Sequence, residues 1–170
     1  MPLQYPTEWP HFFTATHLHW LPLLENNERK DIIIKCLQYL VKNKIVRIHS
    51  FVIMTNHIHL IWQVMPGYTK ENVQLKFMKH TAQEIKIHLA VNDPLLLEKC
   101  LVNKKDRKFQ IWKRNSLSIE LFTPTVYQQK LSYIHNNPVK AGLCKYPEDY
   151  RYSSAGFYND GKDEFGLFAG

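Results

Sequence analysis

Apolar and polar residues alternate along the chain in patterns that predict both strands and helices. Residues 11–20 are rich in aromatic and β-favouring side chains and predict a strand that ends near Pro22. Over residues 31–44 the apolar positions recur at three- and four-residue spacing, which indicates an amphipathic helix. Residues 46–53 and 58–64 predict two further strands joined by a short turn.

The second half of the chain continues with helix, strand and helix. Residues 70–90 predict a helix with a basic flank, and residues 109–112 predict a short strand. Residues 125–136 predict a third helix that Pro138 ends, because proline lacks an amide donor and disfavours a helical residue before it. From about residue 145 the periodicity is weak, so we expect a packed, irregular C-terminal extension.

This order of elements predicts an α+β fold, in which helices pack against an antiparallel sheet. A chain of 170 residues with 45% hydrophobic residues can bury one substantial core but is short for two independent domains. The sequence contains no internal repeat, low-complexity run or obvious linker. We therefore expect residues 1–170 to form a single domain.

The charge balance favours an anionic partner. The chain has 22 Lys and Arg against 15 Asp and Glu, a net charge of +7, spread along the sequence rather than gathered in a tail. Nucleic acid is the first candidate, although ordinary proteins can be equally basic.

Cys36, Cys100 and Cys144 lack the spacing of a disulfide framework or a thiolate zinc site. With no export signal or bilayer-length apolar run, we expect a cytoplasmic protein without membrane contact, nucleoid-associated when bound to DNA.

The most suggestive polar pattern is the pair His57 and His59 within a strongly apolar strand. Because side chains alternate along a strand, the two imidazoles should project from the same face. Neutral imidazole is a good ligand for divalent metals, although two solvent-facing strand histidines would show the same spacing. His17 and His19 repeat it, but they lie nearer a strand end, and we expect them to be polar strand residues or DNA-facing side chains.

A second pattern surrounds Tyr133. On the predicted helix Leu131 and Ile134 belong to a buried side, whereas Tyr133 can lie on an accessible one with Asn137 one turn further on. A phenol can act as a nucleophile toward phosphate, and a carboxamide oxygen can complete a metal shell. The alternative is structural: the tyrosine ring packs on the sheet, and the asparagine caps the helix before proline.

Taken together, these segments carry a family resemblance. The chain reads V-I-M-T-N-H-I-H-L-I over 52–61, Y-I-H-N-N-P-V-K-A-G-L over 133–143, then P-E-D-Y over 147–150 and Y-S-S over 152–154. In these motifs and their order it resembles the REP-associated and related single-tyrosine transposases of the HUH endonuclease superfamily. The resemblance covers nearly the whole chain, and it implies a ferredoxin-like or RRM-like sheet with helices packed against it.

The resemblance also implies roles for individual residues. His57 and His59 would bind a divalent metal, Mg²⁺ or Mn²⁺, and Tyr133 would be the nucleophile. Asn137 stands where relatives place an amide as third metal ligand; its position before Pro138 keeps Asn136 as a second candidate. Many relatives have proline where this chain has Thr55, which alters a turn and not a ligand.

The implied activity is cleavage and rejoining of single-stranded or hairpin DNA through a 5′-phosphotyrosine intermediate. A homodimer is a further expectation, because in some relatives the tyrosine helix acts on the metal site of the partner subunit. Basic side chains are expected to contact DNA, with a solvated surface as the alternative for each: Lys76, Lys79, Lys104, Lys105, Arg107, Lys108, Lys113 and Arg114. Two rival functions are a non-catalytic nucleic-acid-binding module of RRM-like fold and a metal-dependent hydrolase that activates water.

Overall fold

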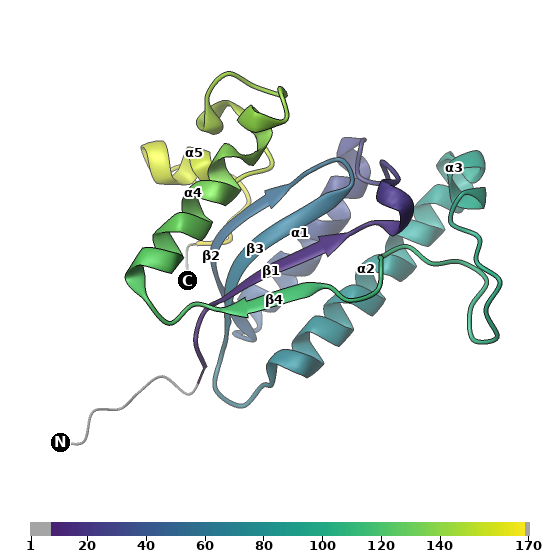
Figure 1. The fold of residues 1–170 in the computed structure, drawn as a ribbon, viewed down its shortest axis with the longest axis horizontal. Coiled ribbons are helices and arrows are strands. Elements are labelled where there is room, and N and C mark those ends of the chain that lie inside the picture. The colour runs from purple at the N-terminus through teal and green to yellow at the C-terminus, as the bar shows by residue number, and fades with distance from the viewer. Residues whose placement is uncertain (1–7, 169–170) are drawn as a thin grey trace.

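The fold is built around one antiparallel sheet (Figure 1). The computed structural model describes residues 8–168 of the chain. The strands lie in the order β2-β3-β1-β4, with bounds β1 His11–Thr16, β2 Val46–Ile53, β3 His57–Val64 and β4 Leu117–Glu120. The predicted α+β fold with an antiparallel sheet is confirmed, and β3 and β1 are its two inner strands.

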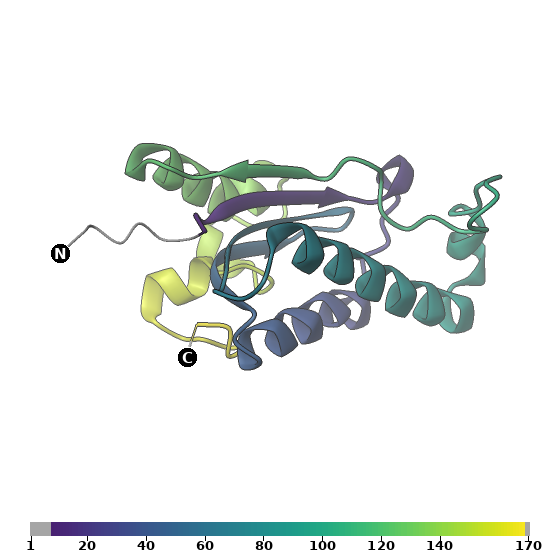
Figure 2. The same ribbon diagram turned by 90° about the horizontal axis from the view of Figure 1, so that it is seen from below.

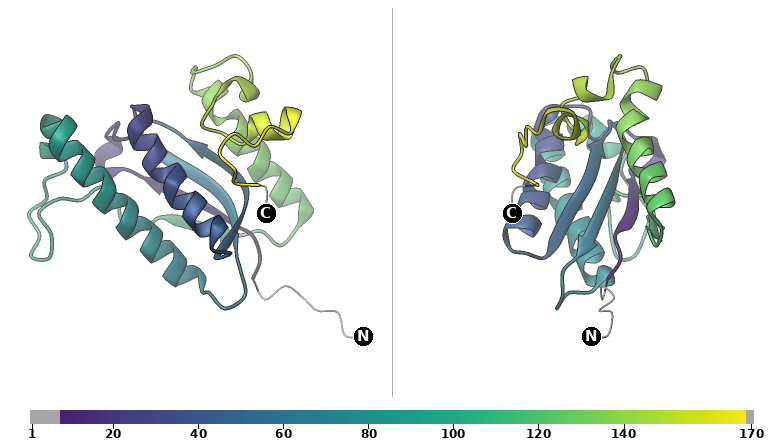
Figure 3. Two further views of the ribbon diagram at one scale, coloured as in Figure 1. Left: turned by 180° about the vertical axis from the view of Figure 1, so that it is seen from behind. Right: turned by 90° about the vertical axis from the view of Figure 1, so that its left-hand side faces the viewer.

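Helices cover both faces of the sheet. α1 (Asn27–Lys42) and α2 (Lys70–Asn92) lie side by side on one face, and α4 (Pro124–Lys140) lies on the other (Figures 2 and 3). The remaining helices are short: η1 Leu18–Trp20, α3 Pro94–Glu98, η2 Pro147–Asp149 and α5 Ala155–Asp160. Within residues 8–168 no helix is both long and apolar enough to cross a bilayer.

Successive side chains along β3 point to opposite faces of the sheet, so the buried residues of this strand are divided between two cores. Ile58, Leu60 and Trp62 are fully buried in the cluster formed with α1 and α2. Ile61, which points the other way, packs in a second cluster with Leu131 and Ile134 of α4. Burying an aliphatic side chain of this size contributes about 1.5–3 kcal/mol, so this second cluster holds α4 firmly against the sheet. The same alternation puts His57 and His59 on the α4 side.

The C-terminal segment covers the edge of the sheet at β2. The amide of Ile53 donates to the carbonyl of Tyr152 at 2.9 Å, and the amide of Ser154 donates to that of Phe51 at 3.0 Å. These bonds satisfy backbone groups that an open edge strand would leave exposed. The segment is packed, as predicted, but it is less irregular than predicted because it contains η2 and α5.

Two strand predictions are wrong in detail. The first strand ends at Thr16, and the chain then turns into η1 instead of continuing to residue 20. Residues 109–112 make only isolated bridges, while the fourth strand lies at residues 117–120. The true β4 has only four residues, none of them fully buried, so its hydrophobic signal was weaker than that of the packed loop before it.

Two helix boundaries also differ from the prediction. α1 begins four residues before Asp31, because the side chain of Asn26 accepts a hydrogen bond from the amide of Arg29 at 2.9 Å and caps the first turn. α4 continues through Pro138 to Lys140. The proline removes only one hydrogen bond, the one that an amide at this position would donate to the carbonyl of Ile134, and its ring is buried.

Candidate active site and metal centre

His57 and His59 lie at the start of β3, on the face that α4 covers. Their ring centroids are 4.8 Å apart, so the predicted shared face is confirmed. His59 is opposite Thr14 in the register of β1 and β3, and its Nδ1 is 2.7 Å from the Thr14 hydroxyl oxygen. Thr14 can therefore accept from an Nδ1–H of His59, which leaves a lone pair on Nε2.

The protonation state of His57 follows from its neighbours. The side-chain amide nitrogen of Asn56 donates to the carbonyl of Trp20 at 3.4 Å, so its oxygen faces His57 Nδ1 at 2.7 Å. Nδ1 therefore carries the proton of a neutral ring. On the other side, His57 Nε2 is 3.3 Å from the side-chain oxygen of Asn137. A neutral imidazole has one proton, so its two contacts with oxygen acceptors cannot both be hydrogen bonds.

Burial keeps both rings in the neutral form. Burial lowers the pKa of His57, and the contact with Asn137 offsets only part of this effect. Burial also lowers the pKa of His59 to about 3, with smaller contributions from the charges of His57 and Lys130. Near neutral pH the lone pair of His57 Nε2 thus faces the lone pairs of Asn137, an arrangement that a cation between them would stabilise.

The donor set fits a divalent metal. His59 Nε2 is buried and has no hydrogen-bond partner within residues 8–168, so it is free to bind an ion. In the described part of the chain no three His, Cys, Asp or Glu side chains gather. Two imidazole nitrogens and the Asn137 amide oxygen are therefore the available donors, and all three are neutral. A bound divalent ion would keep its full charge for an anionic phosphate.

The path of α4 favours Asn137 over Asn136. Asn136 is exposed, and its amide nitrogen donates to the carbonyl of Ser132 at 2.9 Å, one turn back on the same helix. Asn137 lies on the side of His57 because the helix keeps its regular geometry past Pro138. The structural alternative of Asn137 as a helix cap is wrong, since the C-cap is Ala141.

Tyr133 lies beside the histidines and stays accessible. Its ring centroid is 5.2 Å from that of His59 and 6.0 Å from that of Phe12, both edge-on, yet 46% of the residue is exposed. Its hydroxyl takes part in none of the hydrogen bonds among the described residues. By contrast, the hydroxyl of Tyr127 on the same helix contacts His49 Nδ1 at 2.9 Å, and burial raises its pKa.

A lysine that the sequence analysis missed completes this cluster. Lys130 is three residues before Tyr133 on α4, and its ammonium is 4.8 Å from the ring centroid of Phe12 and 5.9 Å from that of Tyr133. Lys130 is half-buried, and in the described residues it forms no ion pair. Its spacing from Tyr133 was a usable signal, because residues three apart are neighbours on a helix.

The predicted DNA contacts are exposed but do not form one surface. Lys113 and Arg114 follow Trp112, and the amide of Lys113 donates to the carbonyl of Thr16, opposite His57 in the sheet. The basic loop at 104–108 lies beyond α3, far along the molecule from α4 (Figure 1), while Lys76 and Lys79 lie on α2, across the sheet from Tyr133. Of these predicted contacts, Lys113 is therefore the one placed next to the histidine pair, whereas the charge of Arg114 acts on Asp106 in the basic loop.

His17 is not a DNA-facing residue, contrary to the prediction. It is fully buried, its ring stacks on Trp112 with centroids 4.1 Å apart, and its Nδ1 contacts the carbonyl of Ile111 at 3.1 Å. Burial lowers its pKa to about 3. His19 is exposed, but it lies in η1 and not on a strand.

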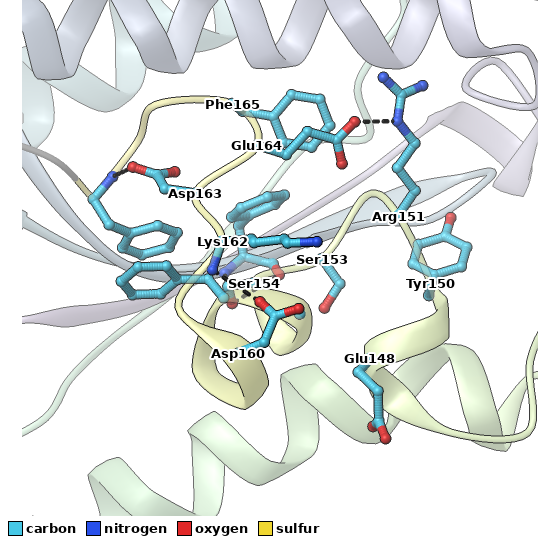
Figure 4. A pocket seen from close by; sticks show the side chains of 14 residues that line it. Glu148, Tyr150, Arg151, Ser153, Ser154, Asp160, Lys162, Asp163, Glu164 and Phe165 are labelled. Atoms are coloured by element: carbon cyan, nitrogen blue, oxygen red, sulfur yellow. Dashed lines mark hydrogen bonds and ion pairs between the residues drawn. The ribbon is translucent and has the colours of Figure 1, made fainter.

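Two hollows on the molecule lie at different places, one beside the candidate site and the other at the C-terminal segment. A shallow hollow of about 170 Å³ is bordered by Tyr133 and Asn137 along α4. A larger one, of about 520 Å³, lies between η2, α5 and the tail, where Arg151 pairs with Glu164 at 2.6 Å (Figure 4). None of the residues that line this larger cavity belongs to the cluster around His57 and His59.

Comparison with known proteins yields structural matches only. No protein-family model and no curated protein matches the sequence. The structure of a REP-associated tyrosine transposase bound to a REP hairpin matches with a TM-score of 0.68 and 17% identity, over 100% of this chain and 91% of that one. A protein described as a transposase from Deinococcus radiodurans R1 matches with a TM-score of 0.51 and 12% identity, over 80% of this chain and 95% of that one. The chain thus has the fold of the HUH tyrosine transposases.

Proposed function

We propose that this chain is a metal-dependent transposase that cleaves and rejoins single-stranded or hairpin DNA through Tyr133. One observation carries the proposal: an accessible phenol lies beside two imidazoles whose ring centroids are 4.8 Å apart. One of these rings has a buried Nε2 without a partner among the described residues, and the other has its Nε2 3.3 Å from an amide oxygen. The fold supports it, because a solved structure of the same fold is a tyrosine transposase bound to a REP hairpin.

The proposed reaction is a transesterification. The oxygen of Tyr133 attacks the scissile phosphorus and loses its proton, the bond from phosphorus to the 3′ oxygen breaks, and that oxygen leaves as a 3′-hydroxyl after taking up a proton. The product is a 5′-phosphotyrosine. Because one phosphodiester replaces another, a 3′-hydroxyl can attack the adduct and restore a DNA strand without ATP.

The side chains around the tyrosine have distinct proposed tasks. His57, His59 and Asn137 would hold Mg²⁺ or Mn²⁺, which when bound polarises the phosphate. Thr14 and Asn56 fix the orientation of the two imidazole rings through their Nδ1 atoms. These oriented groups need little rearrangement when the substrate arrives, which is the main requirement for stabilising charge at a phosphate.

Tyr133 would act on the histidine pair of its own chain. The ring centroids of Tyr133 and His59 are only 5.2 Å apart within one molecule, and Leu131 and Ile134 bury α4 against the same sheet. The site therefore needs no second copy for its assembly, and a homodimer would serve another purpose, such as holding two DNA ends.

Incubation of the wild-type chain and Mn²⁺ with a pool of hairpins carrying single-stranded flanks, followed by denaturing electrophoresis, tests the proposal. Each DNA is labelled at its 5′ or its 3′ end. We expect the 3′ label to migrate with the protein and the 5′ label to appear on a shorter free fragment. Cleavage without any adduct would instead indicate hydrolysis by water, and binding without cleavage would indicate a non-catalytic module.

Lys130 is expected to contribute to the rate by placing a positive charge next to the scissile phosphate. Its ammonium rests on the Phe12 ring and has no ionic partner among residues 8–168, so substrate phosphate is the natural counter-charge. We expect Lys130→Gln to slow single-turnover cleavage by about 10- to 100-fold, with Lys130→Arg much closer to wild type. The control is Lys35→Gln on the exposed side of α1, across the sheet from Tyr133; equal losses in both variants would contradict a specific role for Lys130.

A further inference from the structure

Trp20 is an exposed aromatic residue that the fold holds in an unusual position. It leaves 62% of its surface accessible, although large aromatic side chains are normally much more buried. His19 and Trp20 have φ angles of 53° and 52°, in the left-handed region that residues with a Cβ atom rarely adopt. Two consecutive residues in this conformation persist only where the surroundings enforce it.

Hydrogen bonds from three segments enforce the backbone here. The amide of Trp20 donates to the carbonyl of His17 at 3.1 Å, and the carbonyl of Trp20 accepts from the side chain of Asn56. The amide of His17 in turn donates to the carbonyl of Asn56 at 2.9 Å, and that of Leu18 donates to Ile111 at 3.0 Å. The indole is therefore exposed on a rigid backbone and not on a loose loop.

A cation accompanies the indole. The ammonium of Lys113 is 4.5 Å from the centroid of the Trp20 ring, and Lys113 forms no ion pair with the described residues. An aromatic ring beside a free ammonium matches the two parts of a nucleotide, because the base can stack on the ring while the phosphate approaches the cation. Such contacts are typical of single-strand binding, where the base is unpaired.

This pair lies directly next to the candidate active site. Asn56 connects the two, since its amide nitrogen donates to the carbonyl of Trp20 and its oxygen contacts Nδ1 of His57 at 2.7 Å. On the other side, the amide of Lys113 donates to Thr16, which is opposite His57 in the sheet. A nucleotide bound at Trp20 would thus be a close neighbour of a phosphate bound at His57.

We propose that Trp20 and Lys113 form a binding site for one unpaired nucleotide that flanks the scissile phosphate, with the base stacked on the indole. This inference rests on the proposed function, because it takes single-stranded DNA as the substrate. The site positions the strand and takes no part in bond breaking. Its rigid connection through Asn56 relates the position of the base to that of His57.

Abasic scanning tests this site. Hairpins with single-stranded flanks are prepared with each unpaired base removed in turn, and their affinities are measured by fluorescence anisotropy with chains that carry Tyr133→Phe, so that no DNA is consumed. We expect one position at which loss of the base weakens binding about 5- to 100-fold. Adding Trp20→Ala should weaken binding of intact DNA by a similar factor and remove the effect of that abasic position.

Three controls separate stacking from damage to the site. Trp20→Phe should retain most of the affinity, and Tyr39→Ala, an equally exposed aromatic residue on α1, should leave it unchanged. Mn²⁺ should raise the melting temperature of the Trp20→Ala chain as much as that of its parent, which would show that His57 is still oriented. Lys113→Ala should weaken binding and reduce its salt dependence.

The possible failures are distinguishable. Suppose that the wild type forms the covalent adduct and Tyr133→Phe binds DNA, but loss of each base weakens binding as much with Trp20→Ala as without it. The nucleotide site is then overturned and the proposed function stands. If the chain binds none of the hairpins and the wild type cleaves none, the proposed function fails and the nucleotide site fails with it.

Discussion

Replacement of Tyr133 by phenylalanine is expected to abolish the covalent protein–DNA adduct and reduce strand cleavage by at least about 1,000-fold. Phenylalanine keeps the ring that packs edge-on against Phe12 and His59 but lacks the attacking oxygen. Because the hydroxyl makes no hydrogen bond within the described residues, the melting temperature should change by no more than about 2 °C, and DNA binding should persist. Denaturing electrophoresis with labelled hairpins measures the adduct.

Tyr127→Phe is the matched control on the same helix. The hydroxyl of Tyr127 contacts His49 Nδ1, so its removal should cost about 1 kcal/mol of stability while leaving the adduct intact. An adduct of undiminished yield with Tyr133→Phe would assign the nucleophile to another residue. Loss of the adduct in both variants would point to a general disturbance of α4.

Removal of either imidazole is expected to abolish metal binding. Loss of a supporting residue around a metal typically weakens binding 10- to 100-fold, so loss of a direct ligand in His57→Ala or His59→Ala should exceed about 100-fold. Mn²⁺ at 100 times its Kd stabilises a folded protein by about 2.7 kcal/mol, which corresponds to roughly 5–10 °C for a chain of this size. This shift in melting temperature should occur in the wild type and be absent from both variants.

His135→Ala controls for the general effect of removing a buried histidine. His135 is on α4, burial lowers its pKa to about 4, and its Nε2 already contacts the Ser154 hydroxyl at 2.7 Å. The His135→Ala chain should be less stable yet show the full Mn²⁺-dependent shift. A shift that survives in both His57→Ala and His59→Ala would mean that the metal binds elsewhere.

The sequence predicted those features that rest on local periodicity. The apolar run around His57 and His59 indicated a strand with both imidazoles on one face, and the helical spacing of Leu131 and Ile134 indicated which side of α4 is buried. Both predictions depend on a repeat of two or 3.6 residues, which can be read without knowing the tertiary structure.

Features that depend on the pairing of distant segments could not be predicted in this way. The contact between Thr14 and His59 requires the register of β1 against β3, which no local pattern specifies. The local pattern predicted that Trp20 continues the first strand, whereas hydrogen bonds to distant segments hold this residue in η1. The prediction that the helix ends before Pro138 was wrong for a similar reason. Burial of the proline ring stabilises a helical turn that the local preference of proline would end.

The most direct test of the account is to identify the modified residue. The adduct formed by the wild-type chain with Mn²⁺ and hairpin DNA is digested with nuclease and protease, and the peptides are sequenced by mass spectrometry. We predict a nucleotide joined through its 5′ phosphate to Tyr133 and to no other tyrosine. A nucleotide on a different residue, or cleaved DNA with no modified peptide, would contradict the assignment of Tyr133 as the nucleophile.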